Sequence, residues 1–352
     1  MSIFDQKVIK YEMKPLSSLE KVFPDETPVY RMECQMLSGL WGETVSFQVA
    51  YTGDFVMRER LDVRVVSELA EHVHVRTVEM VPVGRATNGI VDDNYLKTTS
   101  GLYPDLLKDL KDGKVIVYSR QWRSLWVDVD ITNEIPAGEY EIELQLIKED
   151  EVVCSAKQKV TVIGTELPKL DIMHTEWMHA DCLADYYHVE VFSEEHWKLL
   201  ENYFQEYVKR DCNMMLTPLF TSPLDTAIGL ERTTCQLIDV EVKDGEYVFG
   251  FEKLKRWINL CKKCGIEYFE MSHLFSQWGA KYAPKVVATV NGKKEKIFGW
   301  HTPAVGEYTK FLESFLPQLT AKLRKWKIAD VTYFHISDEP REEHLESYKA
   351  AK

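Results

Sequence analysis

Hydrophobic and polar residues alternate along most of the first half of the chain. Over residues 139–146 every second position is apolar and the positions between are glutamate or glutamine, a period typical of strands with one buried face. Turn residues such as Gly53 and Pro136 separate the runs, and Pro104–Leu110 is the one expected helix. We therefore predict a β-sandwich over residues 1–165. Its strands are expected at Val29–Met36, Thr44–Tyr51, Leu61–Val66, His72–Met80, Lys114–Tyr118, Leu125–Ile131, Glu139–Leu146 and Val152–Val162.

From about residue 168 the apolar spacing changes to alternating strands and amphipathic helices. Helices are expected from Ser193, over Glu252–Lys263 and from Thr302, with Pro317 as a kink in the last. Alternation of this kind predicts a parallel sheet with helices outside it. The strands are expected at Leu170–Glu176, Met214–Leu219, Ile266–Phe275 and Val331–Ser337.

Two β-hairpins interrupt this alternation. Their turns are Asp244-Gly245 and Asn291-Gly292, which are strong hairpin dipeptides. Each hairpin follows the carboxyl end of a predicted parallel strand, the side on which α/β barrels carry their active sites. We expect the hairpins to wall a cleft there.

The acidic balance of the chain narrows the possible partners. The formal net charge is −13 over 352 residues, without a basic block, so we expect no nucleic-acid partner. No segment has the apolar length of a signal peptide or a membrane span, which predicts a cytoplasmic protein with no membrane partner, unless a leader is missing.

Seven scattered cysteines indicate reduced thiols rather than a disulfide framework. Cys261 and Cys264 form a C-x-x-C motif, but no second ligand pair follows it at zinc spacing. Cys261 shares an apolar helical stripe with Leu254 and Trp257, so we expect it to pack in the core.

The candidate chemistry is concentrated at Asp338 and Glu339. These neighbouring carboxylates follow the last predicted strand, and Pro340 ends that strand. Two close carboxylates split their pKa values and so provide an acid beside a base. The alternative is that Asp338 caps the next helix and that Glu339 and Arg341 form its solvated first turn.

Further polar and aromatic residues are expected on the same face of the sheet. Aromatic rings beside hydrogen-bonding groups suit a sugar, although each residue could also serve packing alone. Because His174, His273, His335 and Asp338 lack the local spacing of zinc ligands, we expect no metal and no cofactor. The pair His72 and His74 is expected to be solvated on one strand face. The candidate substrate-binding residues are His174, Glu176, Trp177, His273, Trp278, Trp300, His301 and His335.

Several motifs, in this order, resemble glycoside hydrolase family 123, the β-N-acetylgalactosaminidases, and related uncharacterised proteins that share the barrel domain of that family. The resemblance covers nearly the whole chain. The motifs are Glu43-Thr-Val-Ser-Phe-Gln48, Tyr103-Pro-Asp-Leu-Leu107, Trp126-Val-Asp-Val129, Pro136-Ala-Gly-Glu-Tyr140, Leu216-Thr-Pro218, Trp257 with Gly265-Ile266, Ser272-His273 and Ser337-Asp-Glu-Pro340.

The resemblance implies a retaining, substrate-assisted hydrolase of terminal N-acetylhexosamine, with N-acetylgalactosamine as the expected sugar. Glu339 would be the general acid, and Asp338 would hold the 2-acetamido group whose oxygen attacks the anomeric carbon. His335 would orient the pair. Since strand alternation puts His335, Ser337 and Glu339 on one face, Asp338 must turn inward where the strand opens.

The resemblance also implies a TIM-type (β/α)8 barrel, of which residues 168–352 would supply the first half, apparently truncated after the fourth strand. Such a barrel usually takes ~250 residues, and a half sheet leaves an unpaired edge. We therefore expect the isolated chain to be weakly active or inactive, unless a homo-oligomer completes the barrel. The alternatives are a non-catalytic carbohydrate-binding protein and a structural sandwich module with a barrel remnant.

Overall fold

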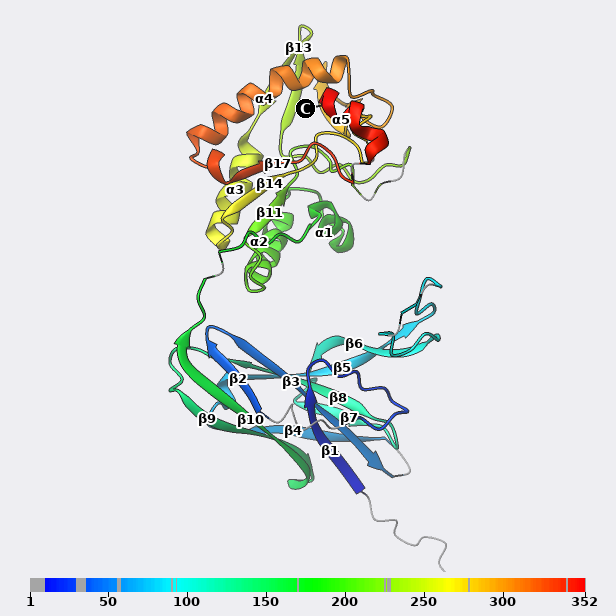
Figure 1. The fold of residues 1–352 in the computed structure, drawn as a ribbon, viewed down its shortest axis with the longest axis vertical. Helices are drawn as coiled ribbons and strands as arrows, with labels where there is room; N and C mark the ends of the chain where they lie inside the picture. The colour runs from blue at the N-terminus through cyan, green and yellow to red at the C-terminus, as the bar shows by residue number, and fades with distance from the viewer. Residues whose placement is uncertain are drawn as a thin grey trace, which may run out of the picture. The chain divides into compact units, whose positions relative to one another are not determined.

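The computed structural model describes residues 10–29, 36–55, 58–89, 91–92, 94–169, 171–224, 226, 229–277, 279–339 and 341–351. The chain divides into two compact units, residues 1–170 and residues 171–352. The fold is β-rich: the described residues of the first unit form strands and a short 3₁₀ turn, and the second unit mixes helices with strands (Figure 1).

The first unit consists of two five-stranded sheets. Their orders are β1-β3-β8-β5-β6 and β2-β10-β9-β4-β7, and all pairs are antiparallel except β2 with β10. The strands are β1 (Lys10–Ser17), β2 (Met36–Trp41), β3 (Thr44–Asp54), β4 (Glu59–Val66), β5 (Val73–Val83), β6 (Gly101–Asp109), β7 (Lys114–Val117), β8 (Arg123–Asp130), β9 (Gly138–Lys148) and β10 (Glu151–Glu166).

One hydrophobic core is shared by the two sheets. Phe47 and Val127 enter it from the first sheet, and Ile142 and Val160 enter it from the second. Each of these side chains is almost fully buried, because in each strand every second residue points to the same side. The alternating pattern that marks the strands in the sequence thus also marks the core.

The predicted helix Pro104–Leu110 is wrong, because these residues lie in strand β6. β6 pairs only with β5 and is an edge strand, a position in which Pro104 is tolerated because no ladder hydrogen bond is required on the open side. Long-range pairing therefore overrides the local pattern.

The pairing of His72 and His74 on one strand face is also wrong. His72 ends a 3₁₀ turn, Ala70–His72, and only His74 lies in β5, where its Nε2 is 3.2 Å from Asp130 Oδ2. Most of the predicted strand Val29–Met36 lies outside the described residues.

The second unit combines helices with two small sheets. Its elements are α1 (Ala180–Tyr187), α2 (Glu194–Val208), β11 (Met214–Thr217), β12 (Asp239–Lys243), β13 (Glu246–Gly250), α3 (Glu252–Cys264), β14 (Tyr268–Met271), β15 (Val286–Val290), β16 (Lys293–Phe298), α4 (Glu307–Lys325), β17 (Thr332–Phe334) and α5 (Leu345–Ala351), with 3₁₀ turns at Ala329–Val331 and Glu342–His344.

The strands β11, β14 and β17 form a parallel sheet in chain order. A parallel bridge from Thr175 to Met214 adds a fourth extended segment beside β11. The helices α2, α3 and α4 run beside these strands (Figure 1) and bury Leu200, Trp257 and Phe315 in a common core with Phe269. This order brings the carboxyl ends of the parallel strands to one edge.

Helix boundaries follow the capping rules in two cases. Ser193 Oγ accepts a hydrogen bond from His196 N at the start of α2, and Gly265, with a φ of 102°, ends α3. The start of α4 differs from the prediction: the helix begins at Glu307 rather than after Thr302. The backbone around Pro303 is held in an extended bridge to Tyr282, and this pairing prevents a helix there.

Two strand predictions are corrected by the parallel sheet. The described part of Leu170–Glu176 pairs only at Thr175, and β17 ends at Phe334 instead of Ser337. Tyr333 and Phe334 are exposed, not buried. Among the described strands, β17 lies at the edge of its sheet and pairs with β14.

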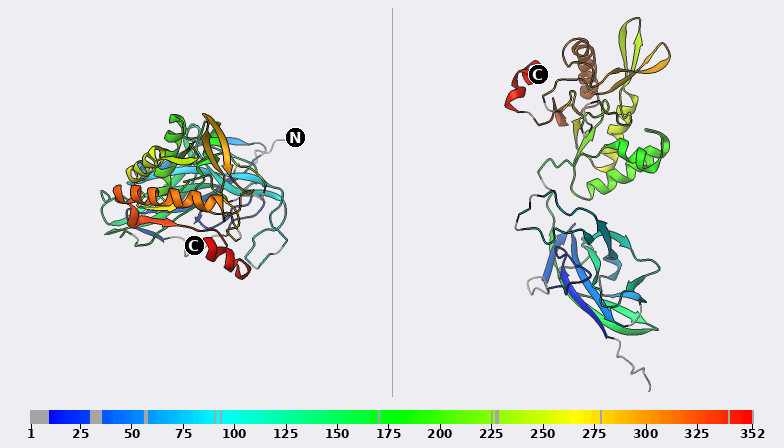
Figure 2. Two further views of the ribbon diagram at one scale, coloured as in Figure 1. Left: turned by 90° about the horizontal axis from the view of Figure 1, so that it is seen from above. Right: turned by 90° about the vertical axis from the view of Figure 1, so that its right-hand side faces the viewer.

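The two predicted hairpins, β12–β13 and β15–β16, are both present. They do not stay separate: β12 pairs in parallel with β15 through Glu241 and Val242, and one four-stranded sheet results. The right-hand view of Figure 2 shows the two hairpins side by side. In the described part of the chain, no helix combines the length and apolar character that a membrane span requires.

Candidate active site

Glu270 is the centre of the polar group at the carboxyl edge of the parallel sheet. It lies in β14 and is 2% exposed. Its Oε2 accepts hydrogen bonds from Trp177 Nε1 at 3.1 Å and from Thr175 Oγ1 at 3.3 Å. Its Oε1 is 2.8 Å from His335 Nε2. These donors come from two segments distant in the sequence, residues 175–177 and His335, and they compensate the burial of a carboxylate.

Glu270 is not among the residues that the sequence predicts for the site. The signal that could have revealed it is a single carboxylate between Phe269 and Met271 in an otherwise apolar run. A charged residue in such a strand is rarely buried unless it is paired. We refer below to Glu270, Thr175, Trp177, His273 and His335 as the Glu270 group.

Along residues 174–177, successive side chains point to opposite sides of the segment. Thr175 and Trp177, two positions apart, both contact Glu270. His174 is directed elsewhere: its Nδ1 is 3.8 Å from Cys212 Sγ, and its Nε2 is 3.4 Å from Glu176 Oε1. The structure therefore brings Trp177 to the Glu270 group and does not bring His174 or Glu176 there.

His273, another member of the Glu270 group, is 1% exposed. Its ring centroid is 4.6 Å from that of His335 and 5.3 Å from that of Trp177. Burial, together with the neighbouring His335, lowers the pKa of His273 to about 4, although Asp338 acts in the opposite direction. Both ring nitrogens are buried without a hydrogen-bond partner, so His273 is a neutral side chain at neutral pH.

Asp338 is half-buried and does not cap a helix. Its Oδ2 accepts a hydrogen bond from Gln277 Nε2 at 3.1 Å, and the following 3₁₀ turn has Arg341 at its N-cap position. The preceding Ser337 donates from Oγ to the carbonyl of Ser276 at 2.7 Å. The segment that follows β14 thus holds Ser337 and Asp338, and the capping interpretation of Asp338 is wrong.

Glu339 is exposed and adopts a φ of 48°. A residue other than glycine is uncommon in this left-handed region, where the backbone is strained. The strand has already ended at Phe334, so residues 335–339 form a loop, in which Asp338 and Ser337 no longer need to alternate. Pro340 lies outside the described residues.

The remaining predicted residues are placed away from this group or cannot be placed. Trp300 contacts Tyr282, with ring centroids 6.3 Å apart, and His301 is exposed next to it. Within the described ranges, no hydrogen bond, ion pair or ring contact links Trp300 or His301 to the Glu270 group. Trp278 lies outside the described residues.

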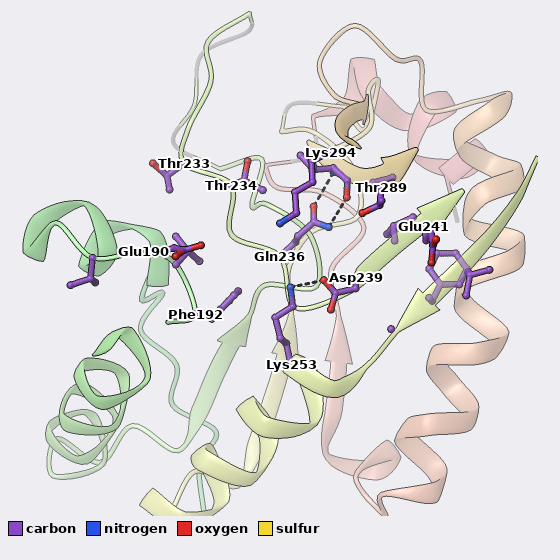
Figure 3. Close-up of a pocket in the computed structure, with 18 residues that line it drawn as sticks. Glu190, Phe192, Thr233, Thr234, Gln236, Asp239, Glu241, Lys253, Thr289 and Lys294 are labelled. Carbon is purple, nitrogen blue, oxygen red and sulfur yellow. Dashed lines mark hydrogen bonds and ion pairs between the residues drawn. The ribbon is translucent and has the colours of Figure 1, made fainter. Parts of the chain in front are cut away.

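A cavity of about 840 Å³ lies between the α1–α2 connection and the four-stranded sheet (Figure 3). Its walls include Phe192, Asp239 and Lys294. Much of its polar surface is already paired: Lys253 Nζ is 2.6 Å from Asp239 Oδ1, and Gln236 bonds to the backbone of Val287. Asp338 and Glu339 do not line this cavity. This cavity is therefore not the cleft that is expected around the acidic pair.

Metal ligation receives no support from the described residues. Within the described ranges, no group of three or more histidine, cysteine, aspartate or glutamate side chains is arranged to hold a metal ion. The geometry instead combines a buried, fully bonded carboxylate, two half-exposed rings and a neighbouring acidic pair. Such a set can bind and orient a polar ligand and can transfer a proton.

The fold and the site together define a β-rich protein with an α/β unit whose polar site lies at the carboxyl ends of parallel strands. Comparison with known proteins makes the assignment more specific. The family model described as "Glycoside hydrolase 123, catalytic domain" matches residues 177–352, half of the chain. The chain belongs to glycoside hydrolase family 123. Among curated proteins, none matches its sequence.

The structure is similar to that of a family 123 glycoside hydrolase from Clostridium perfringens, described in a study of glycolipid glycan hydrolysis. The TM-score is 0.70 at 14% sequence identity, and the match covers 97% of this chain and 60% of that enzyme. This likeness supports a shared fold. A β-glucosidase from Listeria innocua matches with a TM-score of 0.21 at 11% identity, over 46% of this chain and 17% of that enzyme, which is too low to support an argument.

Proposed function

We propose that this protein is a glycoside hydrolase that removes terminal N-acetylhexosamine, with β-linked N-acetylgalactosamine as the preferred sugar. Family membership supports the reaction class. The observation that carries the proposal is that Asp338 is held by Gln277 rather than used as a helix cap.

We further propose that the first unit is a β-sandwich and the second is the first half of a TIM-type barrel.

The proposed mechanism is retaining and substrate-assisted, one of the exceptions to the scheme with a protein nucleophile. Glu339 gives its proton to the glycosidic oxygen as the bond to the leaving group breaks. The oxygen of the 2-acetamido group attacks the anomeric carbon and forms an oxazolinium ion. Asp338 accepts a hydrogen bond from the N–H of the acetamido group. Glu339 then takes a proton from the water that opens the ring. No carboxylate has to reach the anomeric carbon, so two adjacent acids suffice.

Asp338 suits this role because its carboxylate is restrained. The bond from Gln277 engages Oδ2, and the adjacent Ser337 is anchored to Ser276. An orienting group works best when its own rotamer is held by its surroundings. The strained backbone of Glu339 is also consistent with a functional position.

Trp177 and His335 are the proposed sugar contacts. Their side chains are 38% and 44% exposed, respectively, and their ring centroids lie 6.2 Å apart with the ring planes near perpendicular. An indole face stacks on sugar C–H groups, and an imidazole bonds to hydroxyls. Neither His174 nor Glu176 is retained among the proposed contacts, because both lie on the other side of Thr175.

The similar enzyme from Clostridium perfringens hydrolyses glycolipid glycans. We propose that this chain belongs to a protein with a glycan substrate of the same kind. The chain spans 60% of that enzyme, so the activity of the chain by itself is part of the proposal. The second candidate function is non-catalytic carbohydrate binding, which the exposed position of Glu339 allows.

Glu339→Gln separates the two candidate functions. For an enzyme, we expect kcat on a chromogenic N-acetylgalactosaminide to fall about 100-fold or more, with KM changed less than about threefold, because a general acid contributes ~10²–10⁴-fold. Glu342→Gln, an exposed glutamate three residues later, is the matched control. If the unaltered protein binds the sugar without turnover and Glu339→Gln leaves binding unchanged, the non-catalytic function is correct.

A further inference from the structure

We propose that Glu270 is a positioning residue, whose carboxylate fixes the indole of Trp177 and the imidazole of His335 as the two walls of the sugar site. The identity of the ligand rests on the proposed function, whereas the positioning does not. Oε2 of Glu270 receives the indole N–H at 3.1 Å, and Oε1 lies 2.8 Å from His335 Nε2. A single planar carboxylate thereby sets the angle between two rings.

The burial of Glu270 argues against a purely structural role. A carboxylate that is 2% exposed must lose its hydration, and an apolar side chain of similar volume usually stabilises a core as well or better. Glu270 instead has three donors, two of them, Thr175 and Trp177, from the segment before α1 and the third, His335, from the loop after β17. We infer that its use is geometric: it holds side chains that packing alone would leave free to rotate.

Among the described residues, the other neighbours of the two rings form no hydrogen bond that would restrain them. His273 lies against both rings, but its two nitrogens form no hydrogen bond. Trp177 and His335 are each about two-fifths exposed, so solvent covers their outer sides. Within the described ranges, the His335 side chain is held by its pairing with Glu270.

The bond to Glu270 also determines which nitrogen of His335 carries the proton. A carboxylate only accepts, so Nε2 must be protonated, and Nδ1 is the nitrogen that remains for the ligand. In Glu270→Gln the side chain keeps one acceptor, which is enough for the indole N–H, and presents an NH2 group to His335. Nε2 must then accept, and the proton moves to Nδ1.

The test is nitrogen NMR of histidine-labelled full chain at pH 8, without ligand. We expect Nε2 of His335 to carry a proton in the unaltered protein and to lose it in Glu270→Gln, whereas Glu267→Gln, an exposed change at the start of the same segment, leaves it in place. The proposal is overturned if the unaltered protein carries the proton on Nδ1 alone. That measurement requires no variant, so it tests the proposal even where Glu270→Gln does not fold.

Titration with N-acetylgalactosamine provides the second readout. We expect the Kd to rise about tenfold in Glu270→Gln, to be partly restored in Glu270→Asp and to stay unchanged in Glu267→Gln, with thermal unfolding of the folded variants within a few degrees of the original. Unchanged sugar affinity in Glu270→Gln would overturn the positioning role. If the unaltered protein binds no hexosamine, the proposed function fails, and the tautomer of His335 alone decides the role of Glu270.

Discussion

At the scale of single residues, the second unit contains charged and polar side chains whose burial gives them unusual properties. His273 is neutral because it is buried beside His335. Arg232 and Asp181 form a buried pair, with Nε to Oδ2 at 2.7 Å and Nη2 to Oδ1 at 3.0 Å. Cys261 is fully buried in α3, and this burial raises the pKa of its thiol, in agreement with a packing role.

His273 makes the stability of the protein depend on pH. Because its pKa falls from 6.5 to about 4 on folding, the unfolded chain binds the extra proton between these values, and stability decreases as the pH falls through this range. Replacing His273 by Leu removes this contribution. Between pH 7 and pH 4, we expect the free energy of unfolding of the unaltered protein to fall by at most about 3 kcal/mol more than that of the variant. Urea unfolding at each pH measures this difference.

The control for this experiment is His301→Leu, an exposed histidine, which should leave the pH profile as it is. Parallel profiles of the unaltered protein and His273→Leu would contradict the assignment of His273 as a buried neutral side chain.

The Arg232–Asp181 pair should contribute far more to folding than a similar exposed pair. Asp181→Asn leaves a largely buried guanidinium without its charged partner, which we expect to cost about 3 kcal/mol of the free energy of unfolding. Arg256 and Glu194 form an equally bidentate but exposed pair, at 2.6 and 2.7 Å, so Glu194→Gln should change the free energy of unfolding far less, because solvent screens the pair. Equal losses in denaturant titrations would show that burial does not separate the two pairs.

At the scale of elements, β17 is the least protected part of the parallel sheet. It contains three residues, pairs with β14 alone and exposes Tyr333 and Phe334. Edge strands with exposed apolar residues tend to pair with other chains. We propose that a further strand, from a second copy in a homo-oligomer, covers β17 in solution.

Phe334→Lys tests the role of this edge. A lysine on an open edge opposes pairing, so we expect sedimentation velocity to show concentration-dependent association of the unaltered protein and about tenfold weaker association of the variant. Ile163→Lys, at an exposed position of β10 in the first unit, should change nothing. A monomer at every concentration of the unaltered protein would contradict pairing through β17.

At the scale of the whole molecule, each unit has a large hydrophobic core of its own. One is formed by residues of β3 to β10, such as Phe47 and Leu144, and the other by residues of the second unit, such as Trp257 and Phe315. The contacts divide between residues 170 and 171. A unit with its own hydrophobic core can in principle fold independently.

We therefore expect a fragment of residues 1–170 to fold by itself. Its far-ultraviolet circular dichroism should be that of a β protein, and it should unfold in urea in one cooperative transition. A fragment of residues 1–130 lacks β9 and β10, which form the centre of one sheet, and should remain unfolded. A non-cooperative transition of the longer fragment would show that the first unit depends on the second.

The agreement between sequence and structure differs between elements. The start of α2 after Ser193, the buried stripe of α3 and the hairpins at Asp244-Gly245 and Asn291-Gly292 were predicted correctly, because capping residues, apolar period and turn residues are local signals. β6 was assigned as a helix, since its pairing with β5 is not local. The start of α4 was misplaced because the pairing of Pro303 with Tyr282 determines it.

By itself, the sequence determined the strand-rich first half, the alternating second half, the family resemblance and the importance of the Asp338–Glu339 pair as a candidate. These depend on periodicity and on motifs that neighbours in the chain define. Only the tertiary structure decided that Glu270 joins Thr175, Trp177 and His335, that Asp338 is bound by Gln277 and that His174 lies elsewhere. Such contacts join residues far apart in the chain, and which strands become neighbours is decided by the packing of the whole sheet and its helices.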